Sequence, residues 1–325
     1  MEGNKKILVT GSNGQLGQCL KDVVNWSSNK ENYLFTTREE FDIGNVQMME
    51  SYLNEHSDVK IIINCAAYTD VKGAETEEGF KTAMFVNSEC VKNLAKICKE
   101  HNIFLIHFGT DYMYDYYRTT SPIKEDNIQW SSRDEFFWKY YYANKNKYGY
   151  SKCSGIHEIF KEYNFLKEKN FVVIVVSWLY SQYGKNFVKT IREKLKLEEN
   201  INVVYTQIGS PTYAIDLAKY IVDVIENDNC NFNFNAKKNI INFSNLGIAS
   251  WYDIAKKVED IFSLDDKRVL PILETKDNVL RPKYSVLDTS RLLKYKGDKT
   301  YVRHWLNALD ECCRIIRHNE MEKRD

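Results

Sequence analysis

The sequence carries no net charge, because its 45 Lys and Arg residues equal its 45 Asp and Glu residues. A protein that binds nucleic acid normally has a basic excess, so this balance argues against nucleic acid as a partner. No apolar run approaches the ~18 residues that a membrane-spanning helix needs. Residues 1–5 lead directly into a strand-like segment, without the apolar core of a signal peptide. We therefore expect a cytoplasmic protein with no membrane partner.

Cysteine pairs with the spacing of a metal site are also missing. None of the eight cysteines forms a Cys-x-x-Cys motif, and the six histidines show no zinc-binding spacing. Buried free thiols in a reducing compartment are the simpler interpretation. We accordingly predict that the protein has no metal site.

The N-terminal segment has the pattern of a dinucleotide-binding loop. Residues 7–10 resemble a buried strand, three glycines follow at intervals of three, and a helical pattern then begins. Unpaired N–H groups and the helix dipole make the start of such a helix an anion site. Glycines also mark ordinary turns, but their position after an N-terminal strand favours a pyrophosphate site. The predicted cofactor-binding residues here are Gly11, Ser12, Asn13, Gly14, Gln15, Leu16 and Gly17.

Strand-like and helix-like segments alternate along the chain. Strands are predicted at 7–10, 33–37, 59–64, 103–108, 171–176, 201–205 and 239–243. Helices are predicted from 16 onward, at 46–55 and 80–100, from 148 onward, and at 186–197, 214–226, 250–261 and 301–318. This alternation predicts an α/β fold with a doubly wound parallel sheet of the Rossmann type. We expect residues 1–176 to form the cofactor-binding domain, with 201–245 returning to its sheet. Residues 177–200 and 246–325 would form a smaller, C-terminal substrate-binding part.

The residue after the second predicted strand bears on the choice of cofactor. In Rossmann folds this position faces the adenosine ribose. The fork of Arg38 suits the 2′-phosphate of NADP, although Glu39 and Glu40 beside it are acidic. A solvated surface arginine is the other interpretation. We predict NADPH as the cofactor, with NADH as the alternative.

Tyr148 and Lys152 lie four residues apart and would share one face of a helix. A nearby ammonium group favours the phenolate, so it would lower the tyrosine pKa from about 10. Thr110, after the fourth strand, would add a hydroxyl at the sheet edge where active sites of such folds lie. The pair alone can arise by chance among 22 tyrosines. Together with the glycine loop it favours a catalytic site made of Tyr148, Lys152 and Thr110.

Aromatic residues crowd the segment 126–147, directly before Tyr148. They could form a lid over a pocket or pack as a local core. We favour the local core.

Taken in order, these motifs resemble the extended short-chain dehydrogenase/reductases, and within them the dTDP-4-dehydrorhamnose reductase family. The resemblance runs from Ile7 to about Leu309. Besides the glycine loop and residues 148–152, it rests on segments 64–71, 74–75, 86–87, 109–112, 177–180, 186–187, 207–212 and 281–288.

The resemblance implies NADPH-dependent reduction of the C4 ketone of a nucleotide-linked 4-keto-6-deoxy sugar, as in dTDP-L-rhamnose synthesis, by a monomer or homodimer. Tyr148 would protonate the C4 oxygen, Thr110 would hydrogen-bond it, and Lys152 would hold the nicotinamide ribose. The implied cofactor contacts further include Asp42 and Ile43 beside the adenine, and Ala66, Ala67 and Tyr68. Trp178 would stack on the sugar ring and Arg281 would face the diphosphate. The remaining implied substrate contacts are Thr69, Val71, Asp111 and Tyr112.

The sequence departs from the family pattern at Lys72, Val175 and Thr206. Two alternatives therefore stay open. One is a reductase or epimerase of another nucleotide sugar, such as a UDP-sugar. The other is a non-catalytic NADP-binding subunit that resembles the regulatory subunit of methionine adenosyltransferase. Some relatives bridge a dimer through metal-binding glutamates, but Cys19 occupies that position, so no such bridge is expected.

Overall fold

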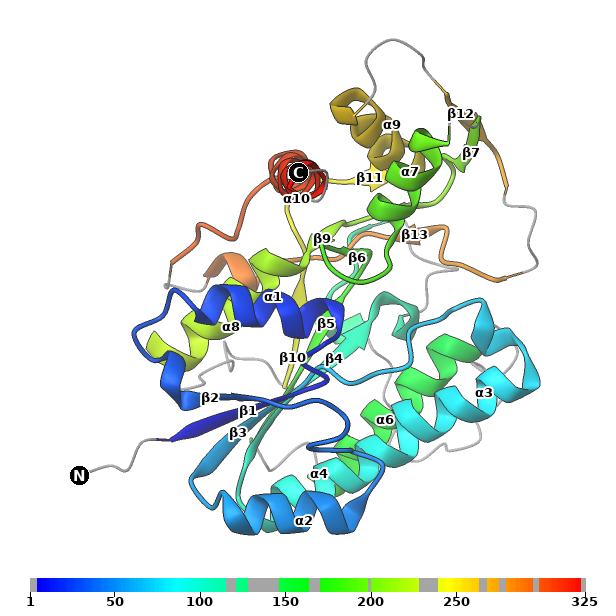
Figure 1. Cartoon of the computed structure of the whole chain (residues 1–325). Helices are drawn as coiled ribbons and strands as arrows, with labels where there is room; N and C mark the ends of the chain where they lie inside the picture. Colours follow the sequence, from blue (N-terminus) through cyan, green and yellow to red (C-terminus); the bar gives the residue numbers. More distant parts are fainter. Residues whose placement is uncertain are drawn as a thin grey trace.

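A six-stranded sheet lies at the centre of the protein, with helices on both faces (Figure 1). The computed structural model describes residues 5–114, 121–127, 146–163, 170–197, 200–227, 239–262, 268–274, 279–294 and 298–322. The strand order is β10-β5-β4-β3-β1-β2, and every neighbouring pair runs parallel. The predicted doubly wound parallel sheet is thus confirmed. Its strands are β1 (Lys6–Thr10), β2 (Tyr33–Phe35), β3 (Val59–Asn64), β4 (Phe104–Thr110), β5 (Phe171–Val176) and β10 (Ile240–Phe243).

The two faces of the sheet bury separate apolar cores. On one face α1 (Gln15–Val24) and α8 (Ala214–Asn227) lie side by side, and α2 (Val46–Glu55), α4 (Cys90–Glu100) and α6 (Lys147–Glu162) cover the other (Figure 1). Leu8 of β1 packs into the core under α4 and α6, while Val9 packs into the core under α1. Because both faces are covered, the central strands are almost continuously aliphatic, as in Ile61–Ile63.

A smaller part of the chain stands over the carboxyl ends of the central strands (Figure 1). It contains three small sheets, with orders β11-β8-β13, β12-β7 and β6-β9. Its elements are β6 (Leu179–Tyr180), α7 (Phe187–Lys196), β7 (Ile201–Val204), β8 (Ile208–Gly209), β9 (Thr212–Tyr213), β11 (Ala249–Ser250), α9 (Trp251–Phe262), β12 (Val269–Ile272), β13 (Tyr284–Ser285) and α10 (Trp305–Met321). Short 3₁₀ turns lie at Lys30–Asn32, Gly73–Glu75, Asp111–Met113, Glu125–Asn127 and Leu292–Lys294.

The structure corrects the predicted return of residues 201–245 to the main sheet. Strand β7 pairs with β12 in the smaller part, with Ile201 beside Val269. Of the described residues in this range, α8 and β10 return: α8 packs on α1, and β10 pairs with β5. The sequence could not separate the two cases, because an apolar strand of four residues suits either sheet.

The helix predicted over 80–100 is three elements: α3 (Glu77–Met84), a π-helical turn (Phe85–Glu89) and α4. Val86 is half-buried, while Asn87 is 1% exposed. The Asn87 amide accepts a hydrogen bond from Tyr68 N at 2.9 Å and donates to Tyr68 O at 3.0 Å. Helix α6 packs directly on this turn, since a Cβ on Gly155 would lie 1.9 Å from Asn87 O. The extra residue of the π turn thus directs a polar side chain inward.

The last helix begins at Trp305 rather than at residue 301, because the His304 ring accepts a hydrogen bond from Leu306 N and caps it. Most of the aromatic segment 126–147 lies outside the described residues. In the part of the chain that is described, no helix is long and apolar enough to cross a membrane.

Candidate active site

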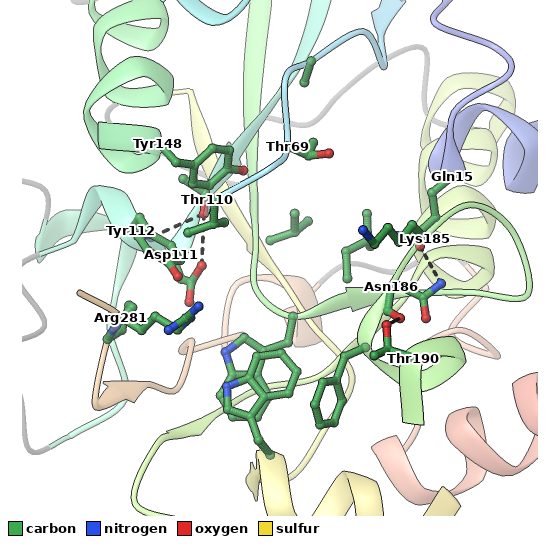
Figure 2. Close-up of a pocket in the computed structure, with 18 of the residues that line it drawn as sticks. Gln15, Thr69, Thr110, Asp111, Tyr112, Tyr148, Lys185, Asn186, Thr190 and Arg281 are labelled. Atoms are coloured by element: carbon green, nitrogen blue, oxygen red, sulfur yellow. Dashed lines mark hydrogen bonds between the residues drawn. The ribbon is translucent and has the colours of Figure 1, made fainter. Parts of the chain in front are cut away.

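A pocket of about 650 Å³ opens at the carboxyl ends of the central strands. It reaches from the glycine loop, past the end of β4 and the first turns of α6, to α7 and α9 of the smaller part (Figure 2). Thirteen predicted site residues line it: Gly14, Gln15, Leu16, Ala67, Thr69, Val71, Thr110, Asp111, Tyr112, Tyr148, Lys152, Trp178 and Arg281. Residues from distant parts of the sequence therefore share one cavity.

The glycine loop has the geometry of an anion site. Gly11 has a φ of +60°, and a Cβ there would lie 2.7 Å from Ala66 N. A Cβ on Gly17 would lie 2.6 Å from Ser12 Cα, so the start of α1 packs closely on the loop. No side chain caps α1 at Gly14, no acidic residue occupies its first turn, and the buried Ser12 hydroxyl has no partner among the described residues. These free donors fit the pyrophosphate of a dinucleotide.

The predicted adenosine contacts lie outside this pocket. The Arg38 side chain is 77% exposed and bonds Asp42 Oδ2 at 3.0 Å. The other oxygen of Asp42 accepts from Gly44 N at 2.8 Å. Ile43 is 5% exposed and belongs to the core under α4. The contacts of Asp42 and Ile43 with the adenine stay predictions, and the Arg38 side chain is accessible. The residues Gly11, Ser12, Asn13, Gly17, Ala66 and Tyr68 also do not line the pocket.

The three predicted catalytic residues do come together. Tyr148 and Lys152 lie on α6, which begins where the Asn146 side chain accepts a hydrogen bond from Gly149 N at 2.8 Å. Thr110 ends β4 and donates to Asp111 Oδ1 at 3.0 Å (Figure 2). The Tyr112 ring meets the Tyr148 ring edge to face, with centroids 5.6 Å apart. The strand end and the helix start thus place a phenol, an ammonium group and a hydroxyl in one pocket.

Burial controls the charges at this site. It raises the pKa of Tyr148, and the neighbouring Asp111 carboxylate raises it further, although a hydrogen bond with Thr110 acts in the opposite direction. The expectation that Lys152 lowers the pKa of Tyr148 is therefore wrong for this structure, because desolvation dominates. Burial also lowers the pKa of Lys152 to about 8 and raises that of Asp111 to about 6.

Two indole rings form the far end of the pocket. Trp178 and Trp251 stack with ring centroids 3.8 Å apart and planes 12° apart, and Phe187 packs against Trp251 at 4.6 Å. Trp178 has a φ of +50°, a left-handed conformation that costs about 1–2 kcal/mol in a residue with a Cβ. Trp251 covers one face of Trp178, so the predicted stacking on a sugar can involve only the other face or the edge.

Polar residues that the sequence analysis did not assign line the wall opposite Tyr148 and Arg281 (Figure 2). Asn186, Thr190 and Lys194 follow each other at intervals of four along α7, and this spacing could have predicted one shared face. Asn186 donates to Gln15 Oε1 at 2.9 Å, which joins α7 to the glycine loop. Lys185, Gln207 and Trp251 also line the pocket, without an equivalent spacing signal.

Among the described residues, no group of three His, Cys, Asp or Glu side chains could hold a metal ion. Cys19, at the position of the family's bridging glutamate, is fully buried.

A family model described as "RmlD substrate binding domain" matches residues 5–318. The chain belongs to this family. A dTDP-4-dehydrorhamnose reductase of Aggregatibacter actinomycetemcomitans is 31% identical over 78% of this chain and 78% of its own length. A dTDP-4-keto-6-deoxy-D-glucose reductase of Streptomyces niveus is 28% identical over 96% of this chain and 98% of its own.

Solved structures of the RmlD family agree with this assignment. A dTDP-4-dehydrorhamnose reductase from Clostridium acetobutylicum has a TM-score of 0.78 and 29% identity, covering 96% of this chain and 99% of its own. A dTDP-4-dehydrorhamnose reductase from Bacillus anthracis, in complex with NADP, has a TM-score of 0.76 and 28% identity, and the match covers 95% of this chain and 98% of its own. The predicted resemblance to the dTDP-4-dehydrorhamnose reductases and to their extended short-chain dehydrogenase/reductase fold is confirmed.

Proposed function

We propose that this protein uses NADPH to reduce the C4 ketone of a dTDP-linked 4-keto-6-deoxy sugar, with dTDP-4-dehydrorhamnose as the leading substrate. One observation carries the proposal: a single pocket joins an uncapped glycine-loop helix, the group of Tyr148, Lys152 and Thr110, and several cationic and aromatic side chains. Relatives with names of this reaction support the choice of sugar, and the NADP complex of the B. anthracis protein supports the choice of cofactor.

The chain's own residues fit the cofactor at the near end of the pocket. The N–H groups at the start of α1 and the Ser12 hydroxyl would hold the pyrophosphate, and Ala67 lies where the cofactor would pass. Arg38 is exposed and would reach the 2′-phosphate after exchanging its contact with Asp42. Lys152 would hold the nicotinamide ribose. When bound, NADPH supplies the hydride that reduces the ketone.

Tyr148 is the proposed acid. Negative charge develops on the C4 oxygen during reduction, and a positioned proton donor must neutralise it. Because burial raises its pKa, Tyr148 enters the reaction protonated. The Thr110 O–H, which donates to Asp111 Oδ1 in this structure, would turn to the same oxygen and donate a second hydrogen bond to it.

Cationic side chains of the pocket would hold the nucleotide diphosphate. Lys185 and Lys194 supply two of them on one wall and Arg281 supplies a third on the opposite wall, and such groups suit a diphosphate. The stacked Trp178 and Trp251 and the ring of Phe187 supply flat apolar surface for a sugar or a base. With the diphosphate and the sugar or base bound in this way, the keto group would lie beside Tyr148.

The test is an assay of NADPH oxidation with purified protein and dTDP-4-dehydrorhamnose, followed by the absorbance of the reduced nicotinamide. Turnover with the dTDP-sugar and little with the UDP-sugar would support the proposal. Turnover only with the UDP-sugar would favour the alternative nucleotide. NADPH binding without turnover of any keto-sugar would favour the regulatory-subunit alternative.

Two further points belong to the proposal. We expect the protein to act as a monomer or homodimer. We also place it in the cytoplasm, because the seven cysteines that the structure describes are all free, as expected in a reducing compartment.

A further inference from the structure

Three polar side chains form a row across the sheet beneath the site. Thr10, Asn64 and His107 are register partners on β1, β3 and β4. They are 0%, 2% and 1% exposed. Their neighbours on the same face include the aliphatic Leu8, Ile62 and Leu105. Burying polar groups in such a layer costs free energy unless they are hydrogen-bonded, so the row has to be accounted for.

The hydrogen bonds of this row determine which histidine nitrogen carries the proton. Asn64 Oδ1 accepts from Thr10 Oγ1 at 2.8 Å and from Ala66 N at 3.2 Å. Two donors on this oxygen fix the amide orientation and direct Asn64 Nδ2 at His107 Nδ1, 3.2 Å away. Nδ1 therefore accepts, and the neutral ring carries its proton on Nε2.

His107 Nε2–H is buried and has no hydrogen-bond partner among the described residues. Lys152 lies on α6, the helix that packs on this face of β4: a Cβ on Gly109, two residues after His107, would lie 3.3 Å from Ile156 Cδ1, one helical turn after Lys152. The Lys152 charge also acts on the His107 ring. Burial and that charge together hold the pKa of His107 well below its usual range, so the ring stays neutral. Cys153 also acts on the charge of Lys152, and Tyr148 and Asp111 line the same pocket as Lys152. Burial raises the pKa of the Cys153 thiol, which keeps it neutral.

We propose that His107 is a positioning residue for Lys152, and that its Nε2–H and the Lys152 ammonium group bind one water molecule between them. Both groups are donors, so they cannot bond each other directly, whereas a water oxygen accepts from both. The row from Thr10 to His107 would then hold Lys152 from the sheet side and leave its other donors for the pocket. The catalytic part of this inference rests on the proposed function, in which Lys152 holds the nicotinamide ribose.

The first test does not depend on activity. In protein with ¹⁵N-labelled histidine, long-range ¹H–¹⁵N spectra report the tautomer of each ring, and His107→Gln assigns the His107 signals. We expect a neutral ring protonated on Nε2 from pH 6 to 9. Its Nε2 signal should inflect near pH 8, where Lys152 titrates, and Lys152→Met should abolish that inflection. Protonation on Nδ1, or an inflection that persists in Lys152→Met, would overturn the proposal.

The second test is the pH profile of kcat. His107→Phe removes the donor, so the charged form of Lys152 loses solvation and its pKa falls. The alkaline limb of the profile should move down by about 0.5–1 pH unit, while the Kd of NADPH changes less than about twofold. His107→Gln, which keeps an N–H donor, should restore most of the profile. Ser88→Ala is the matched control, because it removes the 2.7 Å hydrogen bond between the π turn and Ser154 of α6, which does not involve His107. A similar shift in the control, or none in His107→Phe, would refute the positioning role.

The two tests separate this inference from the proposed function. If the wild type reduces no keto-sugar but His107 shows the expected tautomer and inflection, the proposed function fails and the link between His107 and Lys152 stands. If the sugar is reduced and the spectra differ from expectation, the link alone fails.

Discussion

The indole rings of Trp178 and Trp251 lie 12° from parallel with centroids 3.8 Å apart, although the two residues are far apart in the chain. Trp178 follows β5, and Trp251 begins α9. The stack therefore links the end of the main sheet to the smaller part, at the far end of the pocket.

Trp251→Ala should raise the KM of the nucleotide sugar about two- to tenfold, because an aromatic pair contributes about 0.5–1.5 kcal/mol beyond its buried area. The Kd of NADPH should not change, since the glycine loop is intact. Trp26→Ala is the control, because that ring is 93% exposed and does not line the pocket. Loss of NADPH binding in Trp251→Ala would show that the stack supports the whole cavity rather than its far end.

Tyr148→Phe should lower kcat by about 10²–10⁴, the usual contribution of one general acid. The substitution keeps the ring and its edge contact with Tyr112, so folding and NADPH affinity should be preserved. Single-turnover kinetics measure the effect on the chemical step, and equilibrium binding measures the effect on NADPH affinity. Thr110→Val should lower kcat less than Tyr148→Phe does, because it removes one neutral hydrogen bond. A wild-type rate in Tyr148→Phe would exclude this residue as the acid.

Arg38→Ala should weaken the binding of NADPH and leave the binding of NADH nearly unchanged. The side chain is 77% exposed and its acceptor is Asp42, so its removal disturbs no core packing. The measured quantity is the ratio of the two Kd values, with NADH serving as the internal control. An equal loss for both cofactors would mean that Arg38 does not contact the 2′-phosphate.

Asp111→Asn should stabilise the protein above pH 6. Burial raises the pKa of this carboxyl from its ordinary 3.8 to about 6, so the folded state binds a proton that the unfolded state releases between these values. The contribution of Asp111 to the free energy of unfolding therefore falls as the pH rises from about 4 to 6, by up to about 3 kcal/mol. Urea unfolding should show that Asp111→Asn increases the free energy of unfolding relative to the wild type, and that the increase is larger at pH 7.5 than at pH 4. An increase of equal size at the two pH values would contradict this account.

The spacing of apolar residues located the strands of the central sheet and the helices around it. The strands are covered on both faces and are apolar throughout, whereas each helix packs against the sheet with one face. Strands β3 and β5 begin and end where the sequence placed them. Short-range patterns could not find the π turn at Phe85–Glu89, since it depends on the close approach of α6 at Gly155. The pairing of β7 with β12 is likewise a long-range contact that leaves no local signature.

The residues of the site likewise include some that local sequence patterns predicted and others that they missed. Tyr148, Lys152 and Thr110 were found because each sits at a fixed place in a motif. Trp251 was missed because nothing local distinguishes a tryptophan that faces a pocket from one that faces a core. The pKa of Tyr148 was expected to fall, but its sign depends on burial, which only the folded chain defines.

The buried cysteines give the protein built-in reporters of local opening. Cys19, Cys312 and Cys313 belong to the core on one face of the sheet, and Cys90, Cys98 and Cys153 belong to the core on the other. Burial raises the pKa of all six thiols, so a thiol reagent reacts with them only when the surrounding structure opens. The labelling rates of the two sets therefore measure whether the two layers open as one cooperative unit or separately.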